Sequence, residues 1–443
     1  MRRVLYRLLR GFSALDHWLR ERLTPAGWLL LGTAGAAGAA GIDLHQTVTA
    51  QAFTFLASLL LLAYAASLAF RAHVDLRREL PRYATAGETF VYRVTVTNRG
   101  PALLAGATLA ERFGDPRPGY EEWRAAREPG EERRNWFDRE GGYFRWRWLI
   151  ERRIPESADE IALPPLAPGQ SQSVRLGFTP RRRGRIELAG LRVARTDPIG
   201  LVKGLARVPL EGRVIALPRR YRIPALALPG ARKFQQGGVS LAASVGDSEE
   251  FLSLRDYRPG DPLQRLHWKS FARAGKPIVK EFQDEFFERH ALILDTGSTR
   301  GEDAAFEEAV ALAASFVYTI DTQECLLDLL FVGGDVKTYT AGRGQLHAEH
   351  MLEVLAGVSP SPPGGFDALA RAVLARRGTV SSVIAVLLAW DEPRRKFVAA
   401  ARATGLEVRA LLVCAPGEKP LQAGAGLLVL HPGEIERGLA GLR

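Results

Sequence analysis

A long, almost uncharged region near the start of the chain gives the clearest pattern of apolar positions. Between Thr24 and Phe70, only Asp43 carries a formal charge. The second half, "TVTAQAFTFLASLLLLAYAASLAF", is long enough to cross roughly 30 Å of hydrocarbon at about 1.5 Å per helical residue. The first half is richer in Ala and Gly, and the polar "DLHQ" separates the two halves. The pattern predicts a two-helix transmembrane hairpin over residues 26–71.

Basic residues on both sides of this hairpin predict its orientation. Six Arg lie in residues 1–22 and four lie in residues 71–82, whereas the turn between the helices has neither Lys nor Arg. By the positive-inside rule, both ends of the hairpin then face the cytoplasm. We therefore expect a two-pass protein with a basic cytoplasmic N-terminus at 1–25 and a cytoplasmic C-terminus.

Alternating apolar and polar residues follow the hairpin. The segment "ETFVYRVTVTNRGP" (88–101) alternates in this way, and the pattern recurs at 171–180 and 184–195. Short alternating strands with Pro and Gly between them are typical of a β-sandwich. We predict an immunoglobulin-like β-sandwich over residues 80–220, in which the last two of these strands pair with each other.

Residues 111–160 interrupt the strand pattern. They contain thirteen acidic residues, eleven Arg and four of the eight Trp of the chain. Because a disordered segment does not concentrate Trp, we interpret them as an ordered insertion in the β domain. Its aromatic side chains either pack on the sandwich or form a partner-binding surface. Within it, "YFRWRWLI" (143–150) has the pattern of a strand.

Strands and helices alternate in the last third of the chain. Short apolar runs such as "RHALILDT" (289–296) and "TVSSVIAVLLAWDEP" (379–393) each reach an Asp, and residues at helical spacing follow them. This alternation predicts an α/β domain with a doubly wound, Rossmann-like parallel sheet over residues 286–443. Ligands of such sheets bind at the carboxyl ends of the strands, where we expect Asp295 and Asp391.

The sequence Asp295-Thr-Gly-Ser-Thr299 indicates a candidate cation site. It resembles the metal-ion-dependent adhesion motif of von Willebrand factor A domains, in which a carboxylate, two hydroxyls and a distant Thr and Asp hold Mg²⁺. The candidate ligands here are Asp295, Ser298, Thr299 and Asp391. Gly replaces the first hydroxyl, and Phe366 stands where the distant Thr is expected. The alternative is a metal-free remnant in which Asp295 caps a helix.

A longer motif precedes this domain. The stretch "GDSEEFLSLRDYRPGDPLQRLHWKSFARAGKPIVKEF" resembles the signature of domain-of-unknown-function family 58, and "DPIGL" upstream is similar to the family's Asp-Pro-Phe-Gly-Leu segment. The matching residues are Glu250, Phe251, Leu254, Arg255, Tyr257, Gly260, Asp261, Arg265, Trp268, Ala272 and Arg273. We place this family segment at 221–285. The resemblance extends to the order of membrane hairpin, β domain and von Willebrand factor A-like domain.

Membership of this family would imply a protein without established enzymatic activity. Family members tend to be encoded beside MoxR-type AAA+ ATPases, and sometimes beside transglutaminase-like membrane proteins. The resemblance therefore implies a non-catalytic scaffold or adaptor in a bacterial inner (cytoplasmic) membrane. Such a protein would work with the ATPase in the assembly or maturation of protein complexes, and it would need no cofactor beyond the Mg²⁺ considered above.

The signature allows three interpretations. In the first, Asp261 and His267 form an acid–base pair and Ser270 is a nucleophile, but no other catalytic motif supports a hydrolase. In the second, the Arg side chains pair with nearby carboxylates, Asp261 accepts backbone N–H bonds or caps a helix, and buried Trp268 and Tyr257 brace the domain. In the third, the same residues form a docking surface for a partner.

Net charge adds one further alternative. The chain has a formal charge of +11, and residues 179–222 hold twelve Lys or Arg against three acidic residues. Such a surface would attract anionic lipid or nucleic acid. Because no reading motif accompanies it, we do not expect nucleic acid as a partner. The two cysteines, Cys325 and Cys414, lie in apolar runs and fit buried thiols.

Overall fold

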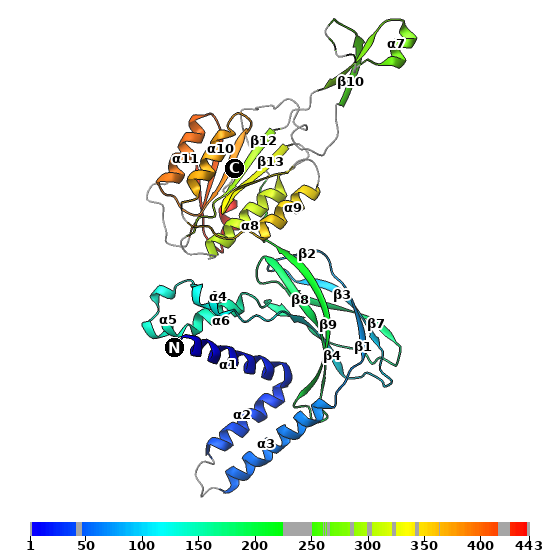
Figure 1. Cartoon of the computed structure of the whole chain (residues 1–443), viewed down its shortest axis with the longest axis vertical. Helices are drawn as coiled ribbons and strands as arrows, with labels where there is room; N and C mark the ends of the chain where they lie inside the picture. The colour runs from blue at the N-terminus through cyan, green and yellow to red at the C-terminus, as the bar shows by residue number, and fades with distance from the viewer. Residues whose placement is uncertain are drawn as a thin grey trace. The chain divides into compact units, whose positions relative to one another are not determined.

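The structure is a computed structural model that describes most of the chain. The described residues are 2–40, 47–224, 250–259, 261, 263, 266–283, 288–298, 304–320, 325–341, 345–362, 364–414 and 426–440. The chain divides into two compact units, Met1–Pro218 and Arg219–Arg443. Each contains both helices and sheets, so the chain is a mixed α/β protein with several sheets (Figure 1).

Three helices begin the first unit: α1 (Arg2–Arg22), α2 (Pro25–Ala40) and α3 (Thr47–Leu68) (Figure 1). Helix α3 is long and apolar enough to cross a membrane, and almost none of it is buried. Helix α2 packs beside α3 and has no charged residue, but it is only 16 residues long. Among the described residues, one helix therefore meets the requirements of a span. The predicted turn at 43–46 lies outside them.

The loop that follows β8 (Gly184–Thr196) packs against these helices and connects them to the β domain. Its Asp197 carboxylate accepts hydrogen bonds from the backbone N–H groups of Ile199, Leu201 and Val202. The bent loop presents Leu201 and Val202 to a small cluster of apolar residues from α2 and α3. The "DPIGL" segment of the sequence is thus one contact between the β domain and the helices.

Two sheets share one hydrophobic core in the rest of this unit. Their strand orders are β1-β3-β7-β5 and β2-β9-β8-β4-β6. The bounds are β1 (Val74–Glu79), β2 (Tyr83–Thr85), β3 (Phe90–Asn98), β4 (Ala107–Phe113), β5 (Ser157–Ala158), β6 (Glu160–Ala162), β7 (Ser171–Thr179), β8 (Gly184–Thr196) and β9 (Lys203–Leu217). The common core takes Val94 and Phe178 from the first sheet, and Leu191 and Val214 from the second.

The three strands predicted in this region correspond to β3, β7 and β8. The expected pairing of the last two is wrong, because β7 pairs with β3 and β5 whereas β8 pairs with β4 and β9. The connection "PRRRG" leads from one sheet to the other. This crossing allows both strands to bury an apolar face in the same core.

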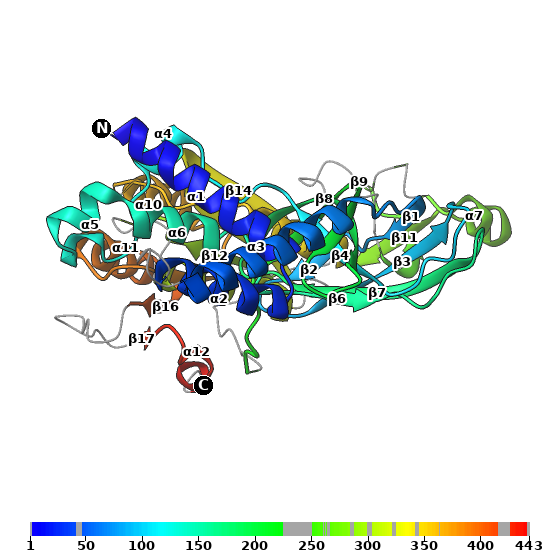
Figure 2. The same cartoon turned by 90° about the horizontal axis from the view of Figure 1, so that it is seen from below.

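The central part of the insertion is helical, with α4 (Tyr120–Ala125), a 3₁₀ turn η1 (Glu131–Arg133), α5 (Trp136–Gly141) and α6 (Tyr143–Glu151). The strand predicted at 143–150 is therefore wrong. Trp146 and Leu149 lie three residues apart on one face of α6, and they are buried together with Trp123 of α4. Apolar residues of α1, which lies beside α4 and α6, complete the cluster (Figure 2). These two Trp thus pack on the N-terminal helix, which neither expectation included.

A six-stranded sheet forms the second unit, in the order β14-β13-β12-β15-β16-β17. Neighbouring strands are parallel except that β14 runs antiparallel to β13. The bounds are β12 (Glu288–Leu294), β13 (Cys325–Gly333), β14 (Asp335–Ala341), β15 (Ser382–Leu387), β16 (Glu407–Val413), β17 (Leu427–Leu430), α8 (Ala304–Thr319), α9 (Gln345–Ala356), α10 (Phe366–Ala375), α11 (Glu392–Ala403) and α12 (Ile435–Leu439). The predicted alternation of strands and helices is confirmed, and both cysteines are buried.

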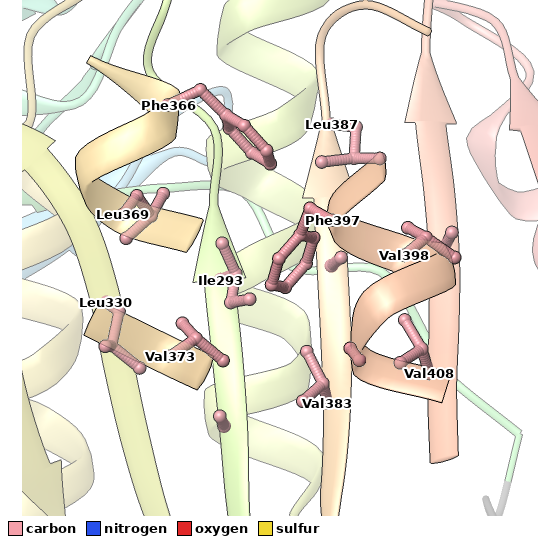
Figure 3. Packing of buried hydrophobic residues seen from close by; sticks show 14 of the residues in the cluster. Ile293, Leu330, Phe366, Leu369, Val373, Val383, Leu387, Phe397, Val398 and Val408 are labelled. Atoms are coloured by element: carbon pink, nitrogen blue, oxygen red, sulfur yellow. The ribbon is translucent and has the colours of Figure 1, made fainter. Parts of the chain in front are cut away.

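The core of this unit lies between the sheet and helices α10 and α11. Figure 3 shows Ile293 and Val383 of the sheet facing Val373 of α10 and Phe397 of α11. The rings of Phe397 and Phe366 meet edge to face, with centroids 5.7 Å apart. The two helices are therefore fixed against the same strands whose ends carry the candidate site.

Strand β12 has β13 on one side and β15 on the other. Such a reversal of strand order creates a topological switch point, where α/β sheets bind their ligands. Asp295 directly follows β12, and its N–H donates to the carbonyl oxygen of Val386 in β15 at 2.9 Å. Asp391 follows β15. The fold thus places both predicted carboxylates at one edge of the sheet.

Candidate functional site

A single guanidinium group joins the two carboxylates at this edge. Arg394 lies in the first turn of α11, whose N-cap is Asp391. Its Nε and Nη2 donate to Oδ2 and Oδ1 of Asp295 at 2.9 and 3.0 Å, and its Nη1 donates to Oδ2 of Asp391 at 2.6 Å. The sequence pattern predicts the convergence of the two Asp, but it does not predict that Arg394 lies between them.

Each carboxylate oxygen of Asp295 accepts two hydrogen bonds. Besides the bonds from Arg394, Oδ1 accepts from the N–H of Gly297 at 3.0 Å, and Oδ2 accepts from the N–H of Leu388 at 3.2 Å. Asp295 is 1% exposed and Arg394 is 5% exposed. Burial by itself lowers the pKa of Arg394, but its hydrogen bonds to Asp295 and the charges of the two carboxylates outweigh it and raise that pKa. The pair is therefore an ionised, buried salt bridge.

Phe366 completes the surroundings of the guanidinium. The Cζ of Arg394 lies 4.7 Å from the centre of the Phe366 ring, which is a cation–π distance. In the adhesion motif a Thr hydroxyl is expected at this position. An aromatic ring cannot coordinate Mg²⁺ as a Thr hydroxyl does, but its face attracts the planar guanidinium of Arg394.

The residues present do not fit the Mg²⁺ site that the sequence suggested. Arg394 holds the position between Asp295 and Asp391 where a cation would bind, and it uses oxygens that a metal would need. Ser298 contributes its backbone N–H to the Ser361 carbonyl at 3.1 Å, and Thr299 lies outside the described residues. Within the described part of the chain, no three His, Cys, Asp or Glu side chains group as metal ligands.

The family signature folds as a second feature of this unit. Strands β10 (Glu250–Asp256) and β11 (Ile278–Gln283) pair antiparallel, and helix α7 (Trp268–Ala274) precedes β11. We call these three elements and the described residues between them the signature hairpin. Backbone hydrogen bonds from Tyr257 to Pro277 and from His267 to Ile278 close its end.

A bidentate ion pair holds the loop of the signature hairpin. Arg255 donates from Nη1 and Nη2 to the two carboxylate oxygens of Asp261 at 2.7 and 2.8 Å. The backbone N–H of Arg258 adds a third hydrogen bond at 2.8 Å. These bonds, with that from Arg255 the strongest, lower the pKa of Asp261 to about 2. The predicted Arg–carboxylate pairing is thus confirmed for this pair, and so is the predicted acceptance of a backbone N–H by Asp261. Capping of a helix by Asp261 is not confirmed, because α7 begins only at Trp268.

The exposure of Trp268 contradicts its predicted bracing role. Its side chain is 64% exposed and meets Phe271 edge to face, with ring centroids 6.2 Å apart. Tyr257 is half-buried and Arg273 is exposed. A helix as short as α7 against a two-stranded ribbon has too little surface to cover a Trp. Gly260, Arg265 and the side chain of Glu250 lie outside the described residues.

The acid–base interpretation of the signature finds little geometric support. Asp261 binds Arg255 through both oxygens. His267 Nδ1 lies 2.6 Å from the hydroxyl of Ser270, but the two residues are N-cap and third residue of the same short helix. This contact is local to one helical turn. In a catalytic triad a carboxylate holds the imidazole in place, but the carboxylate of Asp261 binds Arg255 instead.

The basic surface at 179–222 is partly neutralised within the first unit. Arg192 lies 3.4 Å from Glu21 and 3.2 Å from Glu160, and Lys203 lies 2.7 Å from Glu160. Arg207 also pairs with Glu21 at 2.7 Å. Arg192 and Arg207 stabilise a contact between α1 and the β domain, and Lys203 pairs within the β domain, so these three cations do not form a free phosphate-binding surface.

The second unit carries the detectable family relationship. Residues 253–437 match the family model described as "Protein of unknown function DUF58". The DUF58 match runs from β10 to α12, so it includes both the signature hairpin and the Arg394 site. The "Uncharacterized protein YeaD" of Bacillus subtilis (strain 168) is 27% identical over 220 residues. That alignment covers 47% of this chain and 53% of the relative, so the chain spans about half the length of the relative that it matches.

Solved structures add little to the DUF58 relationship. A PapD-like domain of human CEP192 covers 32% of this chain and 85% of its own length, with 17% identity and a TM-score of 0.16. An exo-β-N-acetylglucosaminidase of Vibrio harveyi covers 77% of this chain and 56% of its own length, with 10% identity and a TM-score of 0.15. Both TM-scores are far too low to identify a fold or to suggest an activity.

Proposed function

We propose that the protein is a non-catalytic, membrane-anchored scaffold that binds a partner protein through the signature hairpin. The observation that carries this proposal is the exposure of large apolar side chains on a motif whose loop is held by the Arg255–Asp261 ion pair. Leu254, Leu263, Trp268 and Phe271 are all exposed although they belong to the most recognisable segment of the sequence. Exposed aromatic side chains on a fixed backbone are typical of binding hot spots.

The surroundings of Trp268 and Phe271 also favour a protein partner. Lys269 and Arg273, next to them on α7, are exposed cations, so the apolar centre has a polar and basic rim. The Arg255–Asp261 pair fixes the loop before binding, which reduces the entropy lost on association. We therefore expect a partner with an apolar groove and an acidic border.

The partner that we propose is a MoxR-type AAA+ ATPase, since the family resemblance implies one. A transglutaminase-like membrane protein is a further expected member of the same assembly. In this proposal, α2 and α3 form the two-pass membrane hairpin, and the β domain and the second unit lie on the cytoplasmic side of a bacterial inner membrane. The β domain is immunoglobulin-like and the second unit is von Willebrand factor A-like, with Asp295 after its first central strand supporting the latter comparison.

Two alternative functions receive less support. We do not propose Mg²⁺-dependent ligand binding, because Arg394 engages both predicted carboxylates. We also do not propose lipid or nucleic-acid binding through the β domain, because Arg192, Lys203 and Arg207 bind carboxylates of the same unit. Catalysis has little supporting geometry among the described residues, because the contact between His267 and Ser270 is local to one short helix.

Co-purification from detergent-solubilised membranes tests the proposal. The full chain should capture a MoxR-type ATPase, and Trp268→Glu should weaken capture by about tenfold or more, the loss expected at a hot spot. Phe137→Glu is the matched control, because Phe137 is an exposed aromatic residue of the insertion, outside the signature hairpin. Equal capture by wild type and Trp268→Glu, or no capture by wild type, would contradict the proposal.

A further inference from the structure

Helix α1 has two apolar faces. One face carries Leu5, Tyr6 and Leu9, which pack against the Trp123–Trp146 cluster of the insertion. The second face consists of exposed residues spaced three or four apart, which is helical spacing. We call it the α1 stripe, and it comprises Val4, Leu8, Phe12, Leu15 and Trp18. An exposed row of large apolar side chains on one helix indicates a binding surface.

The α1 stripe ends at the membrane helix. The ring of Trp18 lies 5.8 Å from that of Tyr64, in the last turns of α3. The guanidinium of Arg22 lies 5.5 Å from the centre of each ring. Trp, Tyr and Arg at the end of an apolar helix are typical of the boundary between hydrocarbon and headgroups. The contact therefore fixes one end of α1 at the depth of that boundary.

The charges of α1 suit an anionic surface. The helix has six Arg against Asp16 and Glu21, so its formal charge is +4. Arg7, one position before Leu8, is exposed beside the stripe. A helix with an apolar stripe, flanking Arg and aromatic residues has the composition of helices that lie in the interface of a membrane.

We propose that α1 lies along the cytoplasmic surface of the membrane, with the α1 stripe buried at the headgroup–acyl boundary of anionic lipid. This inference rests on the proposed membrane anchoring through α3. The aromatic contact of Trp18 and Tyr64 favours lipid over a second protein as the occupant of the stripe. It places the Trp18 end of the stripe beside the end of α3, where the proposed membrane span meets the headgroups. The helix would also hold the insertion, which packs on its other face, close to the membrane.

Site-specific fluorescence of the full chain in vesicles tests the proposal. Both native cysteines are buried, so a maleimide fluorophore will react at an introduced cysteine. The two compared variants are Phe12→Cys on the stripe and His17→Cys, about 140° around the helix from it. Phe12 is 75% exposed and the side chain of His17 is 62% exposed, so both sites accept a label.

Quenching should separate the two positions. In vesicles of phosphatidylcholine with one part in about three of phosphatidylglycerol, a nitroxide near the headgroups should quench position 12 severalfold more than position 17. Aqueous iodide should show the reverse order. In vesicles of phosphatidylcholine alone, quenching of position 12 by the nitroxide should decrease, because the Arg residues lose their anionic partners.

A third label distinguishes failure of this inference from failure of membrane anchoring. Leu61 is an exposed residue of α3, and a label at Leu61→Cys should be quenched by a nitroxide deep in the acyl chains. If position 61 is not quenched, the proposed anchoring is wrong. If position 61 is quenched but position 12 is open to iodide, only the α1 inference is overturned. Shielding of position 12 from both quenchers would also overturn it, and would indicate a protein on the stripe.

Discussion

Arg394 donates two hydrogen bonds to the carboxylate of Asp295, a residue 99 positions earlier in the chain. The pair connects the end of β12 to the first turn of α11 across the switch point of the sheet. Its third hydrogen bond, to Asp391, closes a cluster of one cation and two anions. The edge of the sheet at which α/β proteins bind ligands is therefore occupied by an internal ion pair.

Removal of the Arg394 side chain should destabilise the second unit strongly. Arg394→Ala leaves the buried Asp295 carboxylate without its cation, and breaking a buried pair in this way costs about 3–5 kcal/mol. Denaturant unfolding of the full chain in detergent would measure the loss. The control is Lys396→Ala on the same helix, because Lys396 and Glu392 form an exposed pair whose loss should cost far less than that of a buried pair. Equal losses in the two variants would mean that Arg394 is not part of a buried pair.

Magnesium should distinguish the wild type from the same variant. Millimolar Mg²⁺ should leave the Tm of the wild type unchanged, because Arg394 engages the carboxylate oxygens that a metal would need. In Arg394→Ala the two carboxylates repel each other, so a divalent cation should raise the Tm. EDTA should reverse that gain. A rise in the wild-type Tm with Mg²⁺ would show that the cation site predicted from the sequence exists after all.

There is a physical reason why the sequence predicts the two carboxylates of this site but not the cation between them. Strand ends can be located from apolar runs, so the convergence of Asp295 and Asp391 was predictable. Residue type alone does not say which cation satisfies two converging carboxylates. The available signal was Arg394, three residues after Asp391 in a helix N-terminus, where a cation is otherwise unfavourable. The sequence shows Phe366 in the place of the expected Thr, but it does not show that the ring packs against Arg394.

Elsewhere the errors come from tertiary packing. "YFRWRWLI" contains aromatic residues that favour a strand, but it forms α6 because Trp146 and Leu149 can be buried together only at helical spacing. Trp268 was expected to be buried because Trp is large and apolar. The small ribbon that carries it cannot cover it, and this limit depends on what surrounds the motif rather than on the motif itself.

The Arg255–Asp261 pair should control the rigidity of the signature hairpin. Asp261→Asn removes the charge that attracts Arg255, so backbone amides of β10 and β11 should exchange with deuterium faster. Asp256→Asn is the matched control, because Asp256 pairs with the exposed Lys276 at 2.8 Å rather than with the loop. Mass spectrometry of peptic peptides would compare the variants. Unchanged exchange in Asp261→Asn would mean that the backbone hydrogen bonds alone hold the hairpin.

The same pair gives the hairpin a defined response to acid. The pKa of Asp261 falls from its ordinary 3.8 to about 2 in the folded protein, chiefly through Arg255. A depressed pKa contributes stability that is present above the unfolded value and is lost as the pH falls through the folded value. The difference in protection between wild type and Asp261→Asn should therefore persist down to about pH 4 and vanish towards about pH 2. Loss of the difference near neutral pH would show that the carboxylate is not held by Arg255.

The contact between the helices and the β domain depends on a glycine. A methyl group on Gly27 of α2 would lie 2.2 Å from the carbonyl oxygen of Leu201, in the loop that Asp197 bends. Gly27→Ala should therefore push the loop from the helix and cost about 1–3 kcal/mol, the usual penalty of overpacking. In Gly35→Ala, farther along α2, the added methyl group meets nothing within 4 Å, and Ala favours the helix by up to about 1 kcal/mol. The two variants should thus shift the Tm of the first unit in opposite directions, by about 2–4 °C per kcal/mol for a unit of this size. A common direction of shift would show that α2 does not rest on the Leu201 carbonyl.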